Sequence, residues 1–164
     1  MVPWCRNNKI PIIWVKADYP VLTKEQKEDI RKYLPSHLGT HDNSKKPTCC
    51  LKDTYGQEFY PLVFELMDKN DIILTKRWYS AFMRNNLEDK LKEMGINNIL
   101  VSGVTTHVCV YSTILHSREL GFKNTLIKDC CNSKREKHHN LGIYKARSDG
   151  ALIITTDELL KDQE

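Results

Sequence analysis

Two residues of this chain, Cys109 and Lys76, have the types and positions of a nucleophile and its charged partner. Cys109 follows an apolar run at residues 99–101 and a turn of small residues at 104–106, and a helical pattern then continues to Gly121. A strand, a tight turn and a helix in this order direct backbone N–H groups and the positive end of the helix dipole at one point, which favours a thiolate there. The alternative is that Cys109 is a small buried core residue, as most free cysteines are.

Lys76 directly follows a second apolar run, residues 71–75. An ammonium group close to a thiolate would stabilise the negative charge. A lysine considered alone is most often a solvated surface residue, but a position at the end of an apolar strand favours the functional interpretation. Ligands of parallel sheets bind beyond the carboxyl ends of the strands. We expect Asp18 and Asp129 at the same edge.

Apolar runs alternate with helical patterns along the whole chain. Thr23 and Gln26 form a predicted capping box, and Glu88 and Lys92 a predicted ion pair one helical turn apart. This alternation predicts an α/β fold with a mostly parallel sheet and helices on both faces, in a single domain over residues 1–164. Residues 1–9 are interpreted as the end of a helix or a lead-in loop. Strands are expected at residues 10–18, 71–75, 99–101, 124–128 and 151–155, a short amphipathic segment at 59–67, and helices at 23–34, 86–95, 107–121 and 133–147.

Composition excludes several classes of function. The net charge of +4 arises from 25 basic and 21 acidic residues spread along the chain, which predicts a solvated surface and no nucleic-acid partner. The longest apolar run, residues 10–15, is too short to cross a membrane, and no signal peptide precedes it. Six cysteines without a secretory signal indicate a reduced, cytoplasmic protein.

The cysteines include two adjacent pairs, Cys49-Cys50 and Cys130-Cys131. Adjacent thiols rarely chelate one ion well, so no structural zinc is expected. The first pair lies in a long polar segment, residues 35–56. A loop of this length inside a compact domain is usually functional or forms a lid.

Four motifs resemble the isochorismatase-like cysteine hydrolases, a superfamily that includes nicotinamidases, N-carbamoylsarcosine amidase and isochorismatase. The motifs are DIILTKRWYSAF, GVTTHVCVYST, the Gly121-Phe122 step and IKDCCNS, and the resemblance extends over residues 10–160. It implies a three-layer α/β/α fold, a small-molecule substrate and a homo-oligomer. It also implies that the Cys109 thiolate attacks an amide or related carbonyl carbon, with Lys76 as a second member of the triad.

The resemblance further implies a cis peptide bond between Val104 and Thr105 and an oxyanion hole made of the backbone amides of Thr105 and Cys109. His107, in the same turn, is a candidate for lining the site. The following residues are candidate pocket walls, with packing of the next helix as the alternative: Arg77, Trp78, Tyr79 and Phe82.

The sequence departs from the family pattern in two places. The triad aspartate ends a first, central strand that has no counterpart here, which predicts an N-terminally truncated chain or a degenerate relative. Asp18 aligns loosely with a metal ligand of nicotinamidases, but Pro20 stands where their histidine would be, so no metal cofactor is expected. The alternative function is therefore a catalytically inactive relative that acts as a binding or oligomeric subunit. The retained Lys76 and Cys109 favour the enzyme.

Overall fold

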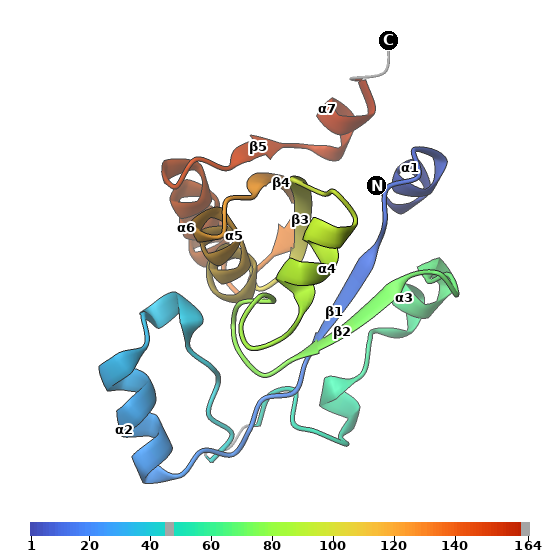
Figure 1. Cartoon of the computed structure of the whole chain (residues 1–164). Coiled ribbons are helices and arrows are strands. Elements are labelled where there is room, and N and C mark those ends of the chain that lie inside the picture. The colour runs from blue at the N-terminus through green and yellow to red at the C-terminus, as the bar shows by residue number, and fades with distance from the viewer. Residues whose placement is uncertain (45–47, 162–164) are drawn as a thin grey trace. The chain divides into compact units, whose positions relative to one another are not determined.

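The computed structural model describes residues 1–44 and 48–161 (Figure 1). The chain divides into two compact units. The first comprises Met1–Leu34 and Gly39–Trp78, and the second comprises Pro35–Leu38 and Tyr79–Glu164. Each unit contains helices and one parallel sheet. The predicted α/β class with parallel strands is thus confirmed, whereas the single-domain organisation stays a prediction.

The sheet of the first unit has two parallel strands, β1 (Ile13–Ala17) and β2 (Ile72–Lys76). Strand β1 is shorter than the predicted 10–18 because Pro11 has no N–H to donate and Lys9 adopts a positive φ of 55°. The helices of this unit are α1 (Val2–Asn7), α2 (Lys24–Tyr33), the 3-10 turn η2 (Tyr55–Gln57) and α3 (Pro61–Leu66).

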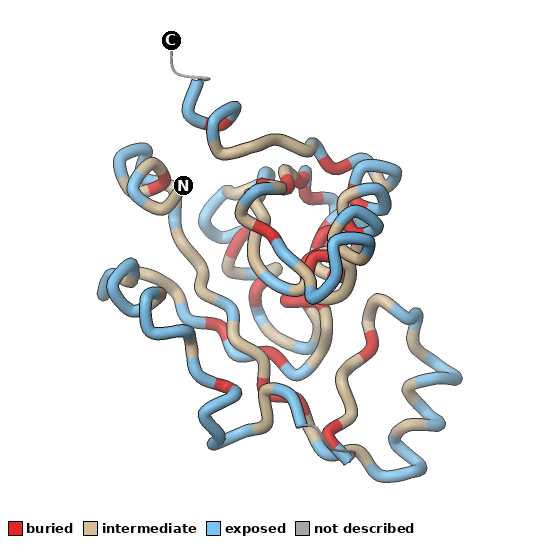
Figure 2. Tube along the Cα trace, turned by 180° about the vertical axis from the view of Figure 1, so that it is seen from behind, coloured by how far each residue is buried: buried red, intermediate tan, exposed pale blue. Residues whose placement is uncertain are grey.

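Helix α2 is attached to the first unit mainly through its ends. Thr23 and Gln26 form the predicted capping box. Lys27 Nζ lies 2.9 Å from Asp42 Oδ2, and Asp42 also accepts a hydrogen bond from the backbone N–H of Leu22. None of the residues of α2 is buried, and Figure 2 shows its surface as exposed or intermediate throughout.

Asp71, which directly precedes β2, joins α1 and β1 to that strand. Its carboxylate accepts hydrogen bonds from Arg6 Nη1 at 2.8 Å, Arg6 Nη2 at 2.7 Å and Trp14 Nε1 at 2.7 Å. The Asp71 side chain is only 6% exposed. The Arg6 guanidinium holds the pKa of this carboxyl well below its usual range.

The sheet of the second unit has the order β3-β4-β5, with all pairs parallel. Its strands are β3 (Asn98–Val104), β4 (Lys123–Asn132) and β5 (Leu152–Ile154). The helices of this unit are the 3-10 turn η1 (Ser36–Leu38), α4 (Leu87–Glu93), the π-helical turn η3 (Thr106–Val110), α5 (Tyr111–Glu119), α6 (Glu136–Ser148) and α7 (Thr156–Lys161).

Strand β4 continues past residue 128, where the sequence predicts its end. The register with β3 shifts between Val101 and Gly103, and pairing resumes with Gly103 opposite Cys131. Asp129 therefore lies inside the strand rather than at its carboxyl end, which corrects its predicted place at the ligand-binding edge. Its carboxylate instead accepts the backbone N–H of Thr156 at 2.9 Å and so holds the start of α7.

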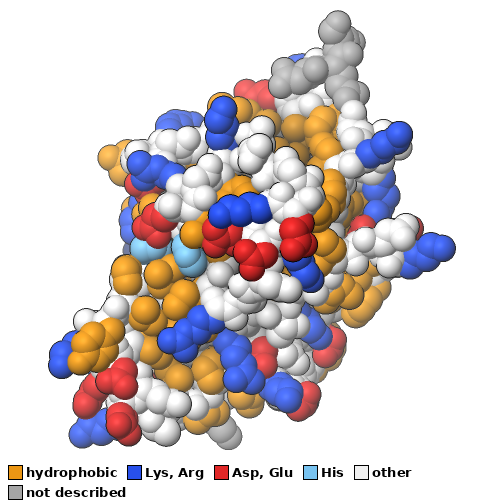
Figure 3. Space-filling model, in the orientation of Figure 1, with side chains coloured by type: hydrophobic (Ala, Val, Ile, Leu, Met, Phe, Trp, Pro, Cys, Tyr) orange, Lys and Arg blue, Asp and Glu red, His pale blue; other side chains and the backbone are white. Residues whose placement is uncertain are grey.

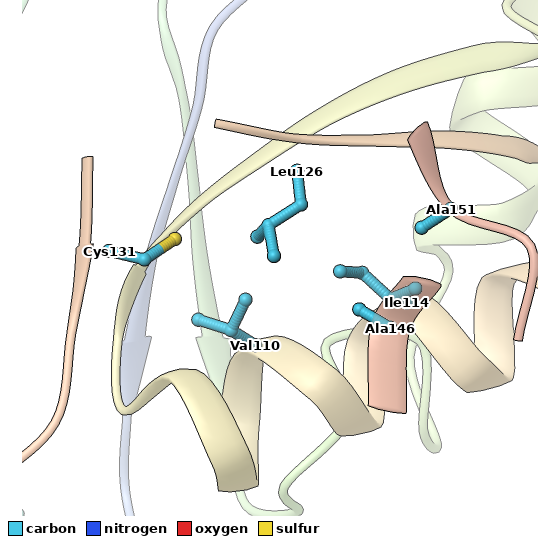
Figure 4. Close-up of a cluster of buried hydrophobic side chains, with 6 residues drawn as sticks. All are labelled: Val110, Ile114, Leu126, Cys131, Ala146 and Ala151. Atoms are coloured by element: carbon cyan, nitrogen blue, oxygen red, sulfur yellow. The ribbon is translucent and has the colours of Figure 1, made fainter. Parts of the chain in front are cut away.

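The centre of strand β4 is buried on both faces of the sheet. Leu126 and Ile127 are adjacent in the strand and both are fully buried. Residues of α5, α6 and β4 surround Leu126 in one hydrophobic cluster (Figure 4). Burial in this cluster raises the pKa of the Cys131 thiol to about 11. The members of the cluster are Val110, Ile114, Leu126, Cys131, Ala146 and Ala151.

Helix α4 contains the ion pair that the sequence predicts. Lys92 and Glu88 form the predicted ion pair, and Gly95 adopts the positive φ of 68° expected after a helix end. Asn86 occupies the N-cap position, but its side chain makes no cap hydrogen bond. Asn85 Oδ1 accepts the Leu87 N–H at 2.9 Å instead.

Within residues 1–44 and 48–161, β1 pairs with β2 alone and β3 pairs with β4 alone. In the same described ranges, no helix combines the length and the apolar composition needed to cross a membrane.

The face shown in Figure 3 carries Lys and Arg side chains interspersed with Asp and Glu.

We expect Asp71→Ala to lower the free energy of unfolding by about 2–4 kcal/mol, because Arg6 and Trp14 would lose their acceptor in a largely buried place. Urea denaturation measures the change. The control is Asp53→Asn. Asp53 forms an ion pair with Lys52, and the two side chains are 83% and 63% exposed, so this substitution should lower the free energy of unfolding by less than about 0.5 kcal/mol. Equal effects of the two substitutions would contradict the anchoring role of Asp71.

Candidate active site

Cys109 lies in the turn η3, which joins the carboxyl end of β3 to α5. The Thr105 carbonyl accepts the backbone N–H of Val108 at 3.1 Å and of Val110 at 3.3 Å, and these bonds curl the chain into a wide turn. The Val104–Thr105 peptide bond is cis. Cys109 is neither fully buried nor fully exposed. A thiol at this junction has the strand-turn-helix setting that the sequence predicts for a nucleophile.

Helix α6 packs directly against this turn. The Thr106 hydroxyl is fully buried and shares a hydrogen bond of 2.9 Å with His139 Nδ1. Gly142 permits the close approach of the two backbones. A Cβ built on Gly142 would lie 2.7 Å from the backbone nitrogen of His107. Only a residue without a side chain therefore fits at this point of α6.

His107 belongs to the contact between η3 and α6. Its Nδ1 lies 3.1 Å from Ser133 Oγ, and its ring centroid lies 4.6 Å from that of His138, with the planes tilted by 33°. Burial lowers the pKa of His107, and the positive groups of His138 and Lys145 lower it further. The structure thus gives His107 partners on the side of α6; its role in lining a substrate site stays a prediction.

A second segment of the same unit, residues 79–82, is fastened to α5 just beyond Cys109. The Thr113 hydroxyl donates to the Cys109 carbonyl at 2.8 Å and accepts the Ala81 N–H at 3.1 Å. Ser80 is fully buried, with its Oγ 3.0 Å from His116 Nδ1. The Ser80 side chain and the Ala81 backbone N–H thus both hold this segment against α5.

Phe82 is only 5% exposed and packs against Phe122 at 5.5 Å between ring centroids and against His116 at 6.1 Å. This packing agrees with the alternative that the sequence left open for the predicted pocket residues. Tyr79 has intermediate exposure.

In the first unit, Lys76 ends β2 and is 7% exposed. Its Nζ donates to the Trp78 carbonyl at 2.7 Å and to the Tyr19 hydroxyl at 3.3 Å. The ammonium also lies 5.2 Å from the centroid of the Tyr19 ring, which is itself 4% exposed. Lys76 is thus held in a buried position by a phenol and a backbone carbonyl, not extended into solvent.

Arg77 and Asp18 lie at the same end of the first sheet. Arg77 Nε is 3.5 Å from Asp18 Oδ2, and the Arg77 side chain is 63% exposed. The Arg77 carbonyl accepts a hydrogen bond from the Thr40 hydroxyl, which connects the loop that contains Thr40 to the carboxyl end of β2. No group of three or more His, Cys, Asp or Glu side chains suited to a metal ion occurs in the part of the chain that the structure describes.

Several residues at these places escaped the sequence analysis. Gly142 could have been suspected, because an isolated glycine inside a helical pattern is costly unless packing requires it. Thr113 lies four residues after Cys109 on the same helix face, a spacing that allows its side chain to return to the Cys109 carbonyl. Nothing in the local pattern singles out Tyr19, since its contact with Lys76 spans 57 positions of the chain.

A family model and several known proteins match this chain. The model of the Isochorismatase domain matches residues 1–158. An uncharacterised isochorismatase family protein of Bacillus subtilis, YrdC, is 33% identical over 103 residues, which cover 56% of this chain and 55% of that protein. The nicotinamidase of Escherichia coli strain K12 is 25% identical over 146 residues, 80% of this chain and 67% of that enzyme.

Solved structures show the same fold. An isochorismatase-like hydrolase from Alkaliphilus metalliredigens aligns with a TM-score of 0.77 and 24% identity, and the match covers 99% of this chain and 80% of that chain. The match to YrdC spans about half of that protein's own length.

Gly142→Ala should destabilise the protein by about 1–3 kcal/mol, although alanine is the better helix former, because the new methyl group would collide with the backbone of η3. Thermal denaturation measures the change. Gly56→Ala is the control, since its Cβ would meet no atom closer than 3.8 Å. A stabilised Gly142→Ala variant would show that α6 and the turn are not in this contact.

The pKa of His107 is lowered in the folded protein, so its contribution to stability is full above about pH 6.5 and is lost as the pH falls below that value, where the unfolded chain binds the proton first. His107→Gln should therefore reduce the fall in urea midpoint between about pH 7.5 and about pH 5.5. Ser133→Ala, which removes only the hydrogen-bond partner of His107, should show the same fall in urea midpoint as the wild type. An unchanged pH dependence in His107→Gln would refute this assignment.

Proposed function

The chain belongs to the isochorismatase domain family, and on this premise we propose that it is a cysteine hydrolase that cleaves a small amide or carbamoyl-type C–N bond. In this proposal Cys109 is the nucleophile and Lys76 its positively charged partner. The observation that carries it is the place of Cys109 in the turn between β3 and α5, held from two sides by α6 and by Thr113. A rigid turn of this kind gives a nucleophile a fixed direction of attack.

The reaction would proceed in two covalent steps. The Cys109 thiolate attacks the carbonyl carbon, a C–S bond forms, and the C–N bond breaks as the amine or ammonia leaves with the proton that the thiol gave up. Water then attacks the thioester carbonyl, the C–S bond breaks, and the acid and the free thiol are released. The backbone amides of Thr105 and Cys109 would stabilise the oxyanion in both steps.

Lys76 would act through its charge. The Lys76 ammonium faces the Tyr19 ring and donates to the Trp78 carbonyl, so a ring face and a hydrogen-bond acceptor both contact its positive charge. Such an ammonium would pair with the thiolate and attract an electron-rich substrate. The resemblance, which extends over residues 10–160, gives no counterpart there for the family aspartate that accepts the thiol proton.

Further parts of the proposal rest on the family and on composition. Arg77, Trp78 and Tyr79 are the candidate substrate contacts. We also propose that the protein forms a homo-oligomer and needs no metal cofactor. We propose a cytoplasmic location as well, in line with the six free cysteines of the structure. The nicotinamidase among the relatives suggests nicotinamide as a first substrate to test.

The alternative is a catalytically inactive relative that serves as a binding or oligomeric subunit. The unmatched aspartate favours it, because a thiol without a base is a poor nucleophile near neutral pH. The buried setting of Lys76 and the fixed turn around Cys109 favour the enzyme, because a protein that acts only as a binding or oligomeric subunit needs neither.

Cys109→Ala should reduce ammonia release from nicotinamide, N-carbamoylsarcosine or a panel of small primary amides by about 10³-fold or more, because the nucleophile is lost. A coupled ammonia assay measures the rate. Cys130→Ser is the matched control, since that half-buried thiol contacts Thr156 and lies in β4 outside the turn. Unchanged turnover in Cys109→Ala would refute the cysteine mechanism.

Alkylation separates the enzyme from the inactive alternative without a known substrate. Iodoacetamide should modify Cys109 below pH 7 faster than it modifies Cys49, an exposed thiol of the same chain. Mass spectrometry of the digested protein gives both rates at once. No ammonia from any probe, together with no preference for Cys109, would establish the inactive alternative.

A further inference from the structure

The adjacent thiols Cys49 and Cys50 lie close together in the loop of the first unit. Their Sγ atoms are 3.6 Å apart, and Cys50 adopts a positive φ of 48°. Cys49 is exposed and Cys50 is partly exposed. We propose that this pair is a vicinal dithiol site that peroxides oxidise to a disulfide, and that the oxidation loosens the loop around Tyr19.

The second adjacent pair of the chain shows that sequence alone does not make such a site. Cys130 and Cys131 lie in β4, where successive side chains point to opposite faces of the sheet. Cys130 Sγ contacts Thr156 Oγ1 at 3.3 Å, whereas Cys131 is buried in the hydrophobic cluster (Figure 4). Only the loop conformation at Cys49 and Cys50 brings two neighbouring sulfurs together.

The oxidation balances with one peroxide per pair. A thiolate of the exposed Cys49 attacks a peroxide oxygen, the O–O bond breaks, and Cys49 becomes a sulfenic acid as water leaves. The Cys50 thiolate then attacks the Cys49 sulfur, the S–O bond breaks, and a second water carries away the oxygen. The two thiols supply two electrons to the peroxide, and a dithiol reductant reverses the change.

Ring closure must rotate the backbone at the two cysteines. Their Sγ atoms have to approach from 3.6 Å to about 2.0 Å. Their Cα atoms, about 3.8 Å apart across a trans peptide, are closer than the about 4.4–6.8 Å that disulfides usually span, so the ring closes only in a strained geometry. Asn43, which is 5% exposed, donates to the Cys49 carbonyl at 2.9 Å and accepts the Cys49 N–H at 2.8 Å. A turned Cys49-Cys50 peptide cannot keep both bonds at these distances.

The loop transmits the change to Tyr19. The Cys50 carbonyl accepts the Tyr19 N–H at 2.9 Å, and Asn43 Nδ2 donates to the Tyr19 carbonyl at the same distance. Tyr19 is the residue whose hydroxyl and ring hold the Lys76 ammonium. Oxidation of the dithiol thus reaches the strand end through backbone bonds on both sides of Tyr19. Any effect on turnover rests on the proposed function, but the structural effect does not.

The test treats the full chain with a small excess of hydrogen peroxide and maps its disulfides by mass spectrometry of digested protein. We expect a Cys49–Cys50 bond within one chain, reversed by dithiothreitol and absent in Cys49→Ser. Hydrogen exchange at the Tyr19 amide should become about tenfold faster or more on oxidation of the wild type and stay unchanged in Cys49→Ser. Cys130→Ser should behave as the wild type.

Three outcomes would overturn the proposal. They are a disulfide that links two chains or involves Cys130, oxidation of Cys49 to a sulfinic acid without a disulfide, and a disulfide that leaves exchange at Tyr19 unchanged. All three outcomes are measured without a substrate, so the test is equally valid if the protein has no hydrolase activity. Conversely, a hydrolase whose dithiol does not oxidise would refute this inference alone.

Discussion

The close contact between the backbone of α6 and the turn η3 is the constraint on which the candidate nucleophile depends. Gly142 lets the two backbones meet, and the buried Thr106 hydroxyl bonds to His139 beside it. Thr113 fastens the other side of the turn to α5. Cys109 therefore stands on a segment that helices hold on either side. Preorganisation of this kind is how a fold prepares a site before a substrate arrives.

The sequence predicts the elements of this fold well where the signal is local. The capping box at Thr23, the ion pair of Glu88 with Lys92 and the glycine after α4 all depend on residues three to seven positions apart. Alternating apolar runs likewise predict the parallel strands, because a strand buried on both faces must be apolar throughout. In β4 the rule holds for the central residues Leu126 and Ile127 and not for the polar residues on either side of them.

Prediction fails where one element depends on a distant partner. The end of β4 was misplaced because its last residues pair with β3 only after a shift in register, and no local pattern encodes that shift. At the start of α4 the side-chain acceptor is Asn85 and not the N-cap residue Asn86, and the sequence does not distinguish between two identical neighbouring side chains. Tyr19, Asn43 and Gly142 acquire their roles only from contacts across the fold. The motif residues Cys109 and Lys76 could be found from the sequence, but the groups that hold them could not.

Helix α2 has a consequence for how the protein opens. It buries none of its residues, and Lys27 links it to Asp42 and Ser44 of the same unit. A helix with so little apolar anchorage lies at the low end of the range of local opening free energies. We therefore expect α2 to unfold and refold as a separate cooperative unit while both sheets stay folded. Proteases would then cleave the native chain first at this helix.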